Sequence, residues 1–213
     1  MLMDAPPEKE DCVPFVTIDE FFDTNGVRVP HIVAKDLEQG FLLLEDFGDV
    51  LLSTQLDDKT VDAHYEQSFK QLIQLQSIDG EGHFPAYSYE KLMTEMSLLT
   101  DWLLPSLQIQ PSDDESALIK RTFAILANAA LAQPQVIVHR DFHSRNLMLL
   151  VDEQEQGVID FQDAVIGADT YDLISITRDA YVQWNPERVY HWFKVFYDLL
   201  PASAKEGRDF EQF

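Results

Sequence analysis

The chain has 213 residues, of which 46% are hydrophobic, and this is enough for one large domain or for two small lobes that share a hinge. Its 15 Lys and Arg residues against 38 Asp and Glu residues give a net charge of −23, which disfavours binding to nucleic acid or to an anionic membrane surface. A ligand that carries phosphate groups therefore needs a local cation, and Mg²⁺ is the simplest one.

The first residues of the chain do not resemble a targeting segment. Residues 1–11 have neither the basic start nor the apolar run of a signal peptide, and the single cysteine, Cys12, excludes an internal disulfide framework. The longest apolar stretches, near Phe41–Leu44 and Val195–Leu200, are far shorter than the ~20 residues that span a bilayer. We therefore expect a cytoplasmic protein without a membrane segment.

Residues 1–48 have the pattern of strands around one short helix. The predicted elements are a helix over 18–24, which begins with the capping-box pair Thr17 and Glu20, and strands over 27–33 and 41–47. The second strand is an apolar run that ends in Glu45-Asp46-Phe47-Gly48.

From Val61 onward apolar residues recur every three or four positions, which predicts helices. One of them spans about 112–132 and opens with a capping box of Ser112 and Glu115. Short strands follow over 136–138, 147–151 and 157–159, with a polar turn over 152–156 between the last two. Two helices close the chain, over about 170–183 and 186–200.

Polar residues are concentrated where these short strands end. Asp141 and Asn146 lie between the first and second strands, and Asp160 follows the third. A hairpin between Asn146 and Asp160 brings these two side chains to the same end. Phosphoryl transfer needs an acceptor hydroxyl, a triphosphate and a metal held in line. Asp141 can take the proton of the hydroxyl, while Asn146 and Asp160 offer oxygen ligands to Mg²⁺ on the phosphates of ATP.

This spacing of His-Arg-Asp, four residues, Asn, and an Asp-Phe pair further on resembles the catalytic signature of the protein-kinase-like superfamily. The segments VIVHRDFHSRNLMLL and GVIDFQDAVIGADTYDLISI more closely resemble the aminoglycoside phosphotransferase family. The resemblance implies an α+β, protein-kinase-like fold that is mostly the helical C-terminal lobe, with a catalytic β-hairpin and a remnant of the N-terminal β-lobe and hinge. Residues 1–48 are then the partial N-lobe with the hinge, and residues 49–213 the C-lobe.

The resemblance also implies a role for each matching residue. It implies that Asp141 is the catalytic base and that Asn146 and Asp160 are Mg²⁺ ligands. It implies that His139 and Asp172 support the catalytic loop, and that the nucleotide hinge consists of Leu44, Glu45, Asp46 and Phe47. Asp163 and Arg145 are candidates for contact with the substrate or with groups around the metal.

Within this family, the likeness is to bacterial cell-wall sugar kinases that phosphorylate the anomeric hydroxyl of N-acetylmuramate or N-acetylglucosamine. The segments APPEKEDCVPFV and GFLLLEDFGDVLL also resemble that subgroup. The resemblance implies ATP and Mg²⁺ as cofactors, an amino sugar as the small-molecule substrate, a role in cell-wall recycling, and neither nucleic acid nor membrane as a partner.

Two features expected of a complete kinase of this type are missing from the sequence before the hinge. These are a loop that covers the phosphates and a strand whose basic residue contacts them. The chain also stops at Phe213, soon after the helix that follows Asp172, where the resemblance implies a continuation. We therefore expect a chain truncated at both ends, which on its own is weakly active or inactive.

Three other functions compete with the sugar kinase. The acidity suits a cationic aminoglycoside or another small-molecule acceptor. A degenerate kinase fold that only binds ligands would explain the missing N-terminal parts. A metal-dependent hydrolase would use His139, Asp141 and His143, which alternate as ligands do on one face of a strand.

Overall fold

The computed structural model describes residues 1–150, 155–205 and 207–213. Its strands are β1 (Leu2–Asp4), β2 (Ile32–Asp36), β3 (Phe41–Leu44), β4 (Gln135–Val138), β5 (Leu147–Leu150), β6 (Glu155–Val158) and β7 (Val165–Ala168). Its longer helices are α1 (Cys12–Thr24), α2 (Val61–Gln76), α3 (Tyr89–Leu98), α5 (Asp113–Leu131), α6 (Tyr171–Thr177) and α7 (Pro186–Leu199). Its short helical segments are η1 (Leu52–Thr54), η2 (Leu99–Leu103), α4 (Leu104–Ser106) and α8 (Ala202–Lys205).

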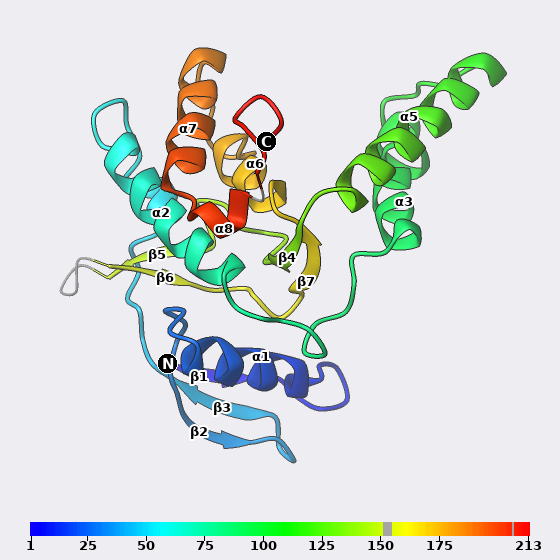
Figure 1. Cartoon of the computed structure of the whole chain (residues 1–213). Helices are drawn as coiled ribbons and strands as arrows, with labels where there is room; N and C mark the ends of the chain where they lie inside the picture. The colour runs from blue at the N-terminus through cyan, green and yellow to red at the C-terminus, as the bar shows by residue number, and fades with distance from the viewer. Residues whose placement is uncertain (151–154, 206) are drawn as a thin grey trace.

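The elements form three regions (Figure 1). A three-stranded sheet and α1 lie at one end, most helices lie at the other, and the antiparallel pairs β5–β6 and β4–β7 lie between them. The predicted strands 136–138, 147–151 and 157–159 correspond to β4, β5 and β6, and most of the predicted turn between the last two lies outside the described residues. The α+β class expected from the sequence is confirmed.

The N-terminal sheet packs its apolar face against α1. Its order is β1-β3-β2, with β3 antiparallel to both neighbours. Leu42 and Leu44 alternate with exposed residues along β3 and are buried in one cluster with Cys12 and Val16 of α1. Period-two alternation therefore gives β3 one buried face, as it does in any half-covered sheet.

Helix α1 begins six residues earlier than the sequence suggests. Its N-cap is Asp11, whose side chain accepts a hydrogen bond from the Val13 backbone N–H at 2.9 Å. Pro14 falls in the first turn, where its missing N–H does no harm. The predicted capping box at Thr17 is wrong because an earlier N-cap and apolar residues at 13, 15 and 16 already extend the helix.

A single hydrophobic core joins the N-terminal residues to the helical part. Phe22 of α1 is fully buried, and its ring lies 5.6 Å from that of Phe84 and 5.8 Å from that of Phe161. Phe15 stacks on Phe161 at 5.0 Å. Because Phe161 directly follows Asp160, the packing of α1 fixes the segment that carries this carboxylate. The division into lobes at residue 48 stays a prediction, and the core runs across it.

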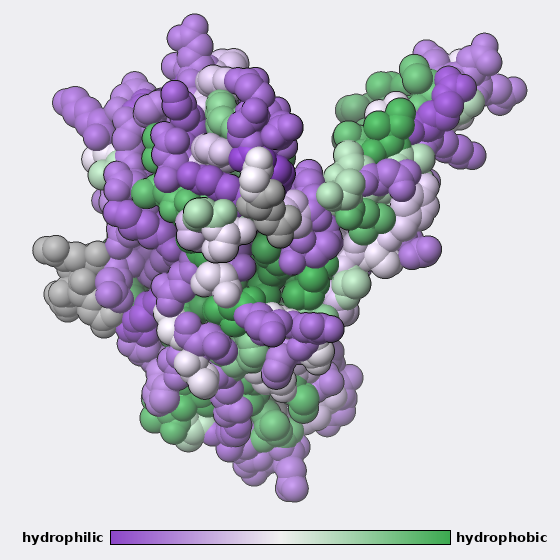
Figure 2. Space-filling view, viewed as in Figure 1, coloured by the Kyte–Doolittle hydropathy of each residue, from purple (hydrophilic) through white to green (hydrophobic). Residues whose placement is uncertain are grey.

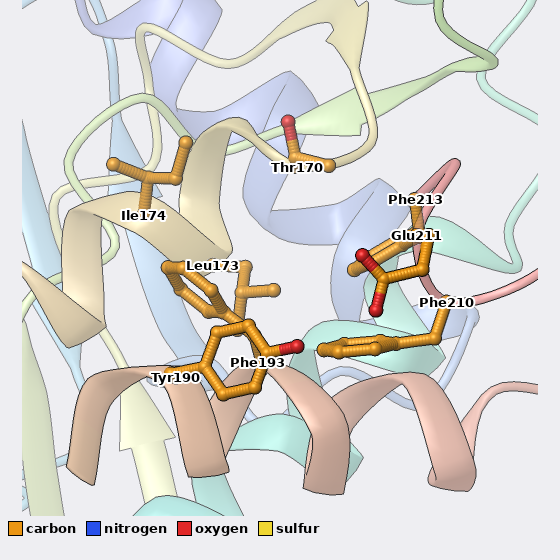
Figure 3. Close-up of a pocket in the computed structure, with 8 residues that line it drawn as sticks. All are labelled: Thr170, Leu173, Ile174, Tyr190, Phe193, Phe210, Glu211 and Phe213. Atoms are coloured by element: carbon orange, nitrogen blue, oxygen red, sulfur yellow. The ribbon is translucent and has the colours of Figure 1, made fainter. Parts of the chain in front are cut away.

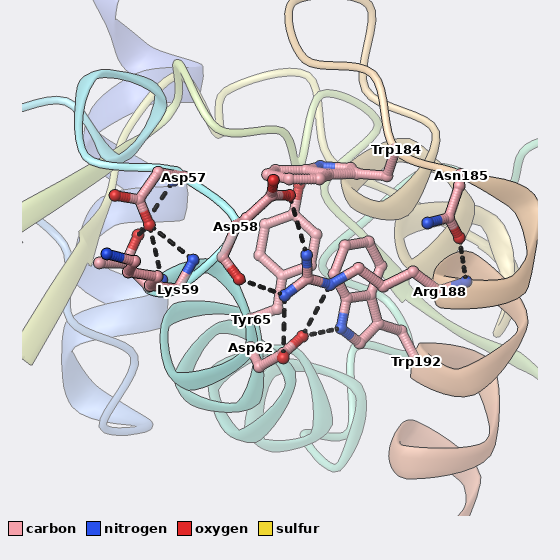
Figure 4. Close-up of polar contacts among 10 residues, drawn as sticks. Asp57, Asp58, Lys59, Asp62, Tyr65, Trp184, Asn185, Arg188 and Trp192 are labelled. Atoms are coloured by element: carbon pink, nitrogen blue, oxygen red, sulfur yellow. Dashed lines mark hydrogen bonds and ion pairs between the residues drawn. The ribbon is translucent and has the colours of Figure 1, made fainter.

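Helices α2 and α7 are joined by a polar cluster around Arg188 (Figure 4). Arg188 donates to Asp62 through Nη2 at 2.9 Å and through Nε at 3.2 Å, which lowers the pKa of Asp62. The Trp192 indole donates to the same carboxylate at 2.8 Å, and the guanidinium lies over the rings of Trp184 and Trp192. The start of α7, which Asn185 caps as predicted, is thereby held against the first turn of α2.

The hairpin of α3 and α5 projects from the body of the molecule (Figure 1). Its surface is partly apolar, as Figure 2 shows, with exposed side chains at Leu98, Trp102, Leu103, Leu107, Leu118, Ile125 and Leu126.

In the described part of the chain no helix combines the length and the apolar character needed to cross a membrane.

Candidate active site

The three side chains expected to carry the chemistry lie around the loop between β4 and β5. Asn146 Nδ2 donates to the Asp141 carbonyl oxygen at 3.0 Å and to Asp160 Oδ2 at 3.2 Å. Asp160 follows β6, which pairs with β5 so that Leu147 lies opposite Val158. The structure therefore brings Asn146 and Asp160 together, as the predicted hairpin requires, and Asp141 lies exposed in the same loop.

His139 joins the segment after β4 to the segment after β6. Its Nε2 lies 3.0 Å from the Ile159 carbonyl oxygen, which can only accept, so Nε2 carries the hydrogen. The side chain is fully buried, and burial lowers the pKa of His139 to about 4, against the weaker opposing effects of this hydrogen bond and of Asp160. A neutral imidazole in this position supports the bracing role proposed for His139.

Because burial holds His139 neutral, acidification should destabilise the fold through this residue. The unfolded chain takes up a proton near pH 6.5 and the folded chain only near pH 4, so this residue's contribution to stability is present above the first value and is lost below it. Relative to His139→Gln, the wild type should lose about 2 kcal/mol of unfolding free energy between about pH 7.5 and about pH 5. Urea unfolding of both proteins at each pH measures this difference.

His191 provides the control for that measurement. It is exposed on α7, so its hydration changes little on folding. His191→Gln should track the wild type at every pH, and a His139→Gln variant that does the same would contradict the assigned cause.

Asp172, in the first turn of α6, holds the backbone of the loop between β4 and β5. Its two oxygens accept the backbone N–H groups of His139 at 2.7 Å and Arg140 at 3.1 Å. The carboxyl is fully buried, and burial raises the pKa of Asp172 to about 7 although both hydrogen bonds act in the opposite direction. Arg140 has a φ of 78°, a conformation that a side chain other than glycine rarely adopts, so these two hydrogen bonds fix a strained turn beside Asp141.

A second buried carboxylate, Asp179, supports the other half of the loop. Asp179 Oδ2 accepts the backbone N–H of Ser144 at 2.9 Å and also the Ser144 hydroxyl. Its Oδ1 accepts the backbone N–H of Tyr181 at 2.8 Å. Asp179 could not be identified from the sequence, because nothing local links it to a serine 35 positions earlier in the chain.

The hairpin of α3 and α5 also contacts the loop between β4 and β5, through Glu95 of α3. The Arg140 Nη2 atom pairs with Glu95 Oε1 at 2.8 Å, and Arg140 lies over the ring of the buried Tyr87. The Tyr87 hydroxyl donates to the same glutamate. Glu95 and Tyr87 were missed as well, since no motif marks either residue and Glu95 lies 45 positions before Arg140 in the chain.

The two residues expected near the substrate lie in different segments. Asp163, between β6 and β7, is largely exposed, with Oδ1 3.6 Å from Arg140 Nη1. Arg145, between β4 and β5, lies over the ring of Tyr181, with Cζ 4.2 Å from the ring centre. Their proposed roles thus rest on their positions in the chain near Asp141, Asn146 and Asp160, and not on contact with Asn146 or Asp160.

The predicted hinge follows β3 and is partly occupied by internal hydrogen bonds. The Leu44 N–H donates to the Met1 carbonyl and the Glu45 N–H to the His31 carbonyl, each at 2.8 Å. Arg28 holds the Glu45 side chain through two hydrogen bonds, which lower the pKa of this glutamate. The backbone of Asp46 and Phe47 is therefore the better candidate for pairing with a base.

Neither the histidines of the loop nor a cavity elsewhere supports a different centre. Within the described ranges, no group of three His, Cys, Asp or Glu side chains is arranged to hold a metal ion, and His139 already donates to Ile159. A cavity of about 270 Å³ lies between α6, α7 and residues 210–213 (Figure 3). It is lined mainly by apolar side chains such as Leu173, Phe193 and Phe213 and includes none of the expected site residues.

Comparison with known proteins shows the family of the chain. The model of the phosphotransferase enzyme family (APH) matches residues 1–206, and the chain belongs to this family. It is 41% identical over 207 residues to N-acetylmuramate/N-acetylglucosamine kinase of Pseudomonas aeruginosa, covering 94% of this chain and 61% of that protein. It is 37% identical over 205 residues to the protein of the same name from Pseudomonas putida, covering 96% of this chain and 60% of that protein. The chain thus spans about three fifths of the length of these relatives.

Solved structures confirm the protein-kinase-like fold. Aminoglycoside phosphotransferase APH(2'')-Ib, in its ADP-bound form, superposes with a TM-score of 0.62 at 20% identity, covering 91% of this chain and 68% of that one. Aminoglycoside phosphotransferase APH(3'')-Id from Streptomyces rimosus, in complex with ADP and streptomycin, gives a TM-score of 0.65 at 14% identity, covering 96% and 82%. At these identities the likeness concerns the fold.

Proposed function

We propose that the protein is an ATP-dependent phosphotransferase that moves the γ-phosphoryl group to a hydroxyl of an amino sugar of the N-acetylmuramate or N-acetylglucosamine type. The main observation behind this proposal is the position of the Asn146 side chain. Its Nδ2 donates to the Asp141 carbonyl oxygen at 3.0 Å and to Asp160 Oδ2 at 3.2 Å. The names of the relatives supply the substrate class. Since ATP and such sugars meet inside the cell, we place the reaction in the cytoplasm, in the recycling of cell-wall sugars.

In this proposal Asp141 orients the acceptor. Its exposed carboxylate accepts a hydrogen bond from the sugar hydroxyl and takes the proton as the oxygen attacks. His139, Asp172 and Asp179 do not touch the reactants. They hold the loop in one conformation, so that the hydroxyl is delivered in line with the phosphate.

Asn146 and Asp160 fit a magnesium ion. Both offer oxygen atoms, both are accessible, and the anchoring of Asn146 through Nδ2 leaves Oδ1 free to act as a ligand. One or two protein oxygens suffice for Mg²⁺, which takes its other ligands from water and phosphate. When bound, this ion neutralises negative charge on the phosphates of ATP.

The nucleotide base would lie against the segment after β3, with Asp46 and Phe47 as the hinge residues that remain available. Residues 1–48 would then act as the N-lobe above the nucleotide, and the rest of the chain would supply the catalytic loop and the acceptor side. Gly157 makes room for the Phe47 side chain of this segment, because a Cβ at position 157 would lie only 2.2 Å from the Phe47 ring.

Product formation with defined acceptors tests the proposal. Protein at a concentration comparable to that of the sugar is incubated with ATP, Mg²⁺ and either N-acetylmuramate, N-acetylglucosamine or an aminoglycoside, and the sugar phosphate is detected by ³¹P NMR. We expect a phosphorylated amino sugar. If only the aminoglycoside were phosphorylated, the acceptor would be an aminoglycoside and not an amino sugar of the cell wall. ATP binding without any transfer would support the non-catalytic alternative.

A further inference from the structure

The loop that carries Asp141 and Asn146 also carries a guanidinium without an acidic partner. Within the described residues Arg145 forms no ion pair, and neither do Arg121 and Arg178, whereas Arg140, Arg188 and Arg208 pair with carboxylates. Arg145 differs from the other two unpaired arginines in its place, directly beside the proposed metal ligand Asn146 and in the loop that carries Asp141. A guanidinium at this place is available to an anionic group of a reactant.

The surroundings of Arg145 form a platform for such an anion. Its Cζ lies 4.2 Å from the centre of the Tyr181 ring, and stacking on an aromatic face leaves the edge nitrogens of a guanidinium free. Those nitrogens match the two oxygens of a carboxylate or a phosphate. The His143 ring meets Tyr181 edge-on at 5.2 Å, and its Nδ1 has no hydrogen-bond partner in the described part of the chain.

This platform, defined as Arg145, Tyr181 and His143, is built into the fold. Buried Asp179 accepts the backbone N–H groups of both Ser144, next to Arg145, and Tyr181. The loop and the segment after α6 are therefore held at a fixed distance. A preorganised cation loses little freedom when a ligand binds, so it contributes more to affinity than a mobile surface arginine.

The platform and the proposed metal ligands contact different segments of the chain. The Asn146 side chain contacts Asp160 after β6, whereas the Arg145 side chain contacts Tyr181 after α6. If Asn146 and Asp160 face the phosphates of the nucleotide, then Arg145 faces the helical side, from which the acceptor would approach Asp141.

We propose that Arg145, stacked on Tyr181, binds a carboxylate of the acceptor sugar. This inference rests on the proposed function and concerns its specificity. N-acetylmuramate carries a lactyl carboxylate, which N-acetylglucosamine lacks, so the two sugars differ by the group that the platform would recognise. Arg145 is then a specificity-determining residue that favours the carboxylated sugar and is dispensable for the other one.

Equilibrium binding of both sugars, measured by isothermal titration calorimetry with Mg²⁺ and a non-hydrolysable ATP analogue, tests this assignment without requiring turnover. Arg145→Gln should weaken N-acetylmuramate binding by roughly 10- to 100-fold, the range for a charge-assisted hydrogen-bonded pair, and leave N-acetylglucosamine within about twofold. Tyr181→Ala, which removes the ring on which the guanidinium is stacked, should resemble Arg145→Gln. Arg121→Gln, on exposed α5, is the matched control and should change neither affinity.

The outcomes separate this inference from the proposed function. Equal weakening of both sugars, no change in either, or equal affinity of the wild type for both would overturn the carboxylate assignment while sugar phosphorylation stands. Weaker binding of the ATP analogue, with sugar affinities unchanged, would assign the platform to a phosphate and overturn its acceptor role. Failure of the wild type to bind either sugar would overturn both proposals.

Discussion

Replacing Asp141 with asparagine is expected to reduce phosphoryl transfer to the sugar by about 10²- to 10⁴-fold, the usual contribution of a general base. The amide keeps the size of the side chain and can still contact the hydroxyl, but it cannot take the proton. Single-turnover transfer from [γ-³²P]ATP to the sugar measures the effect. Binding of ATP should be nearly unchanged, since the groups proposed to hold the nucleotide lie at Asn146, Asp160 and the hinge.

Asp198 on α7 provides the matched control, because it is an exposed aspartate far along the chain from the loop. Asp198→Asn should transfer at the wild-type rate. An Asp141→Asn protein that transfers equally fast would remove the general base from the mechanism, even if the fold and the family stand. A parallel loss of ATP affinity would instead indicate that Asp141 shapes the nucleotide site.

The parts of the fold that local chemistry determines could be predicted from sequence. The capping box of Ser112 and Glu115 places the start of α5, and Asn185 before Pro186 places the start of α7. The same logic failed at Thr17, because Asp11 already caps the helix, which begins at Cys12. A local rule is therefore reliable only where no earlier signal has started the helix.

Strands without alternation were harder to place. The predicted strand over 27–33 is wrong for most of its length, since Val27 and Val29 are buried in the core as an irregular segment and β2 begins only at Ile32. Strand β7, which pairs with β4, was not predicted, because VIGA is too short to show a period. Both errors concern segments whose conformation depends on distant partners.

The candidate site divides in the same way. Asn146 and Asp160 could be brought together from sequence because a hairpin links them, whereas Glu95, Asp179 and Tyr181 reach the loop from 45, 35 and 36 positions away through side chains that no motif marks. The groups proposed to do chemistry were visible as a motif. Of the groups that hold them in place, His139 and Asp172 were named from the resemblance, whereas Glu95, Asp179 and Tyr181 became visible only with the structure.

Replacing Asp172 with alanine is expected to cost about 2–4 kcal/mol of unfolding free energy, because two buried backbone N–H groups lose their acceptor at about 1–3 kcal/mol each. Removing a carboxyl whose pKa burial has raised to about 7 offsets part of this cost. Urea unfolding at neutral pH measures the change. Sugar phosphorylation should fall at least about tenfold as well, since the strained turn at Arg140 loses the hydrogen bonds that hold it beside Asp141.

Asp172→Asn separates bracing from direct chemistry. The amide retains one acceptor oxygen for His139 or Arg140, so the loss of stability should be about half that of Asp172→Ala, and activity should follow stability in the same order. If both variants were as stable as the wild type yet inactive, Asp172 would have to act on the reactants themselves. The structure argues against a direct role, because the carboxylate is buried and both of its oxygens already accept backbone N–H groups, those of His139 and Arg140.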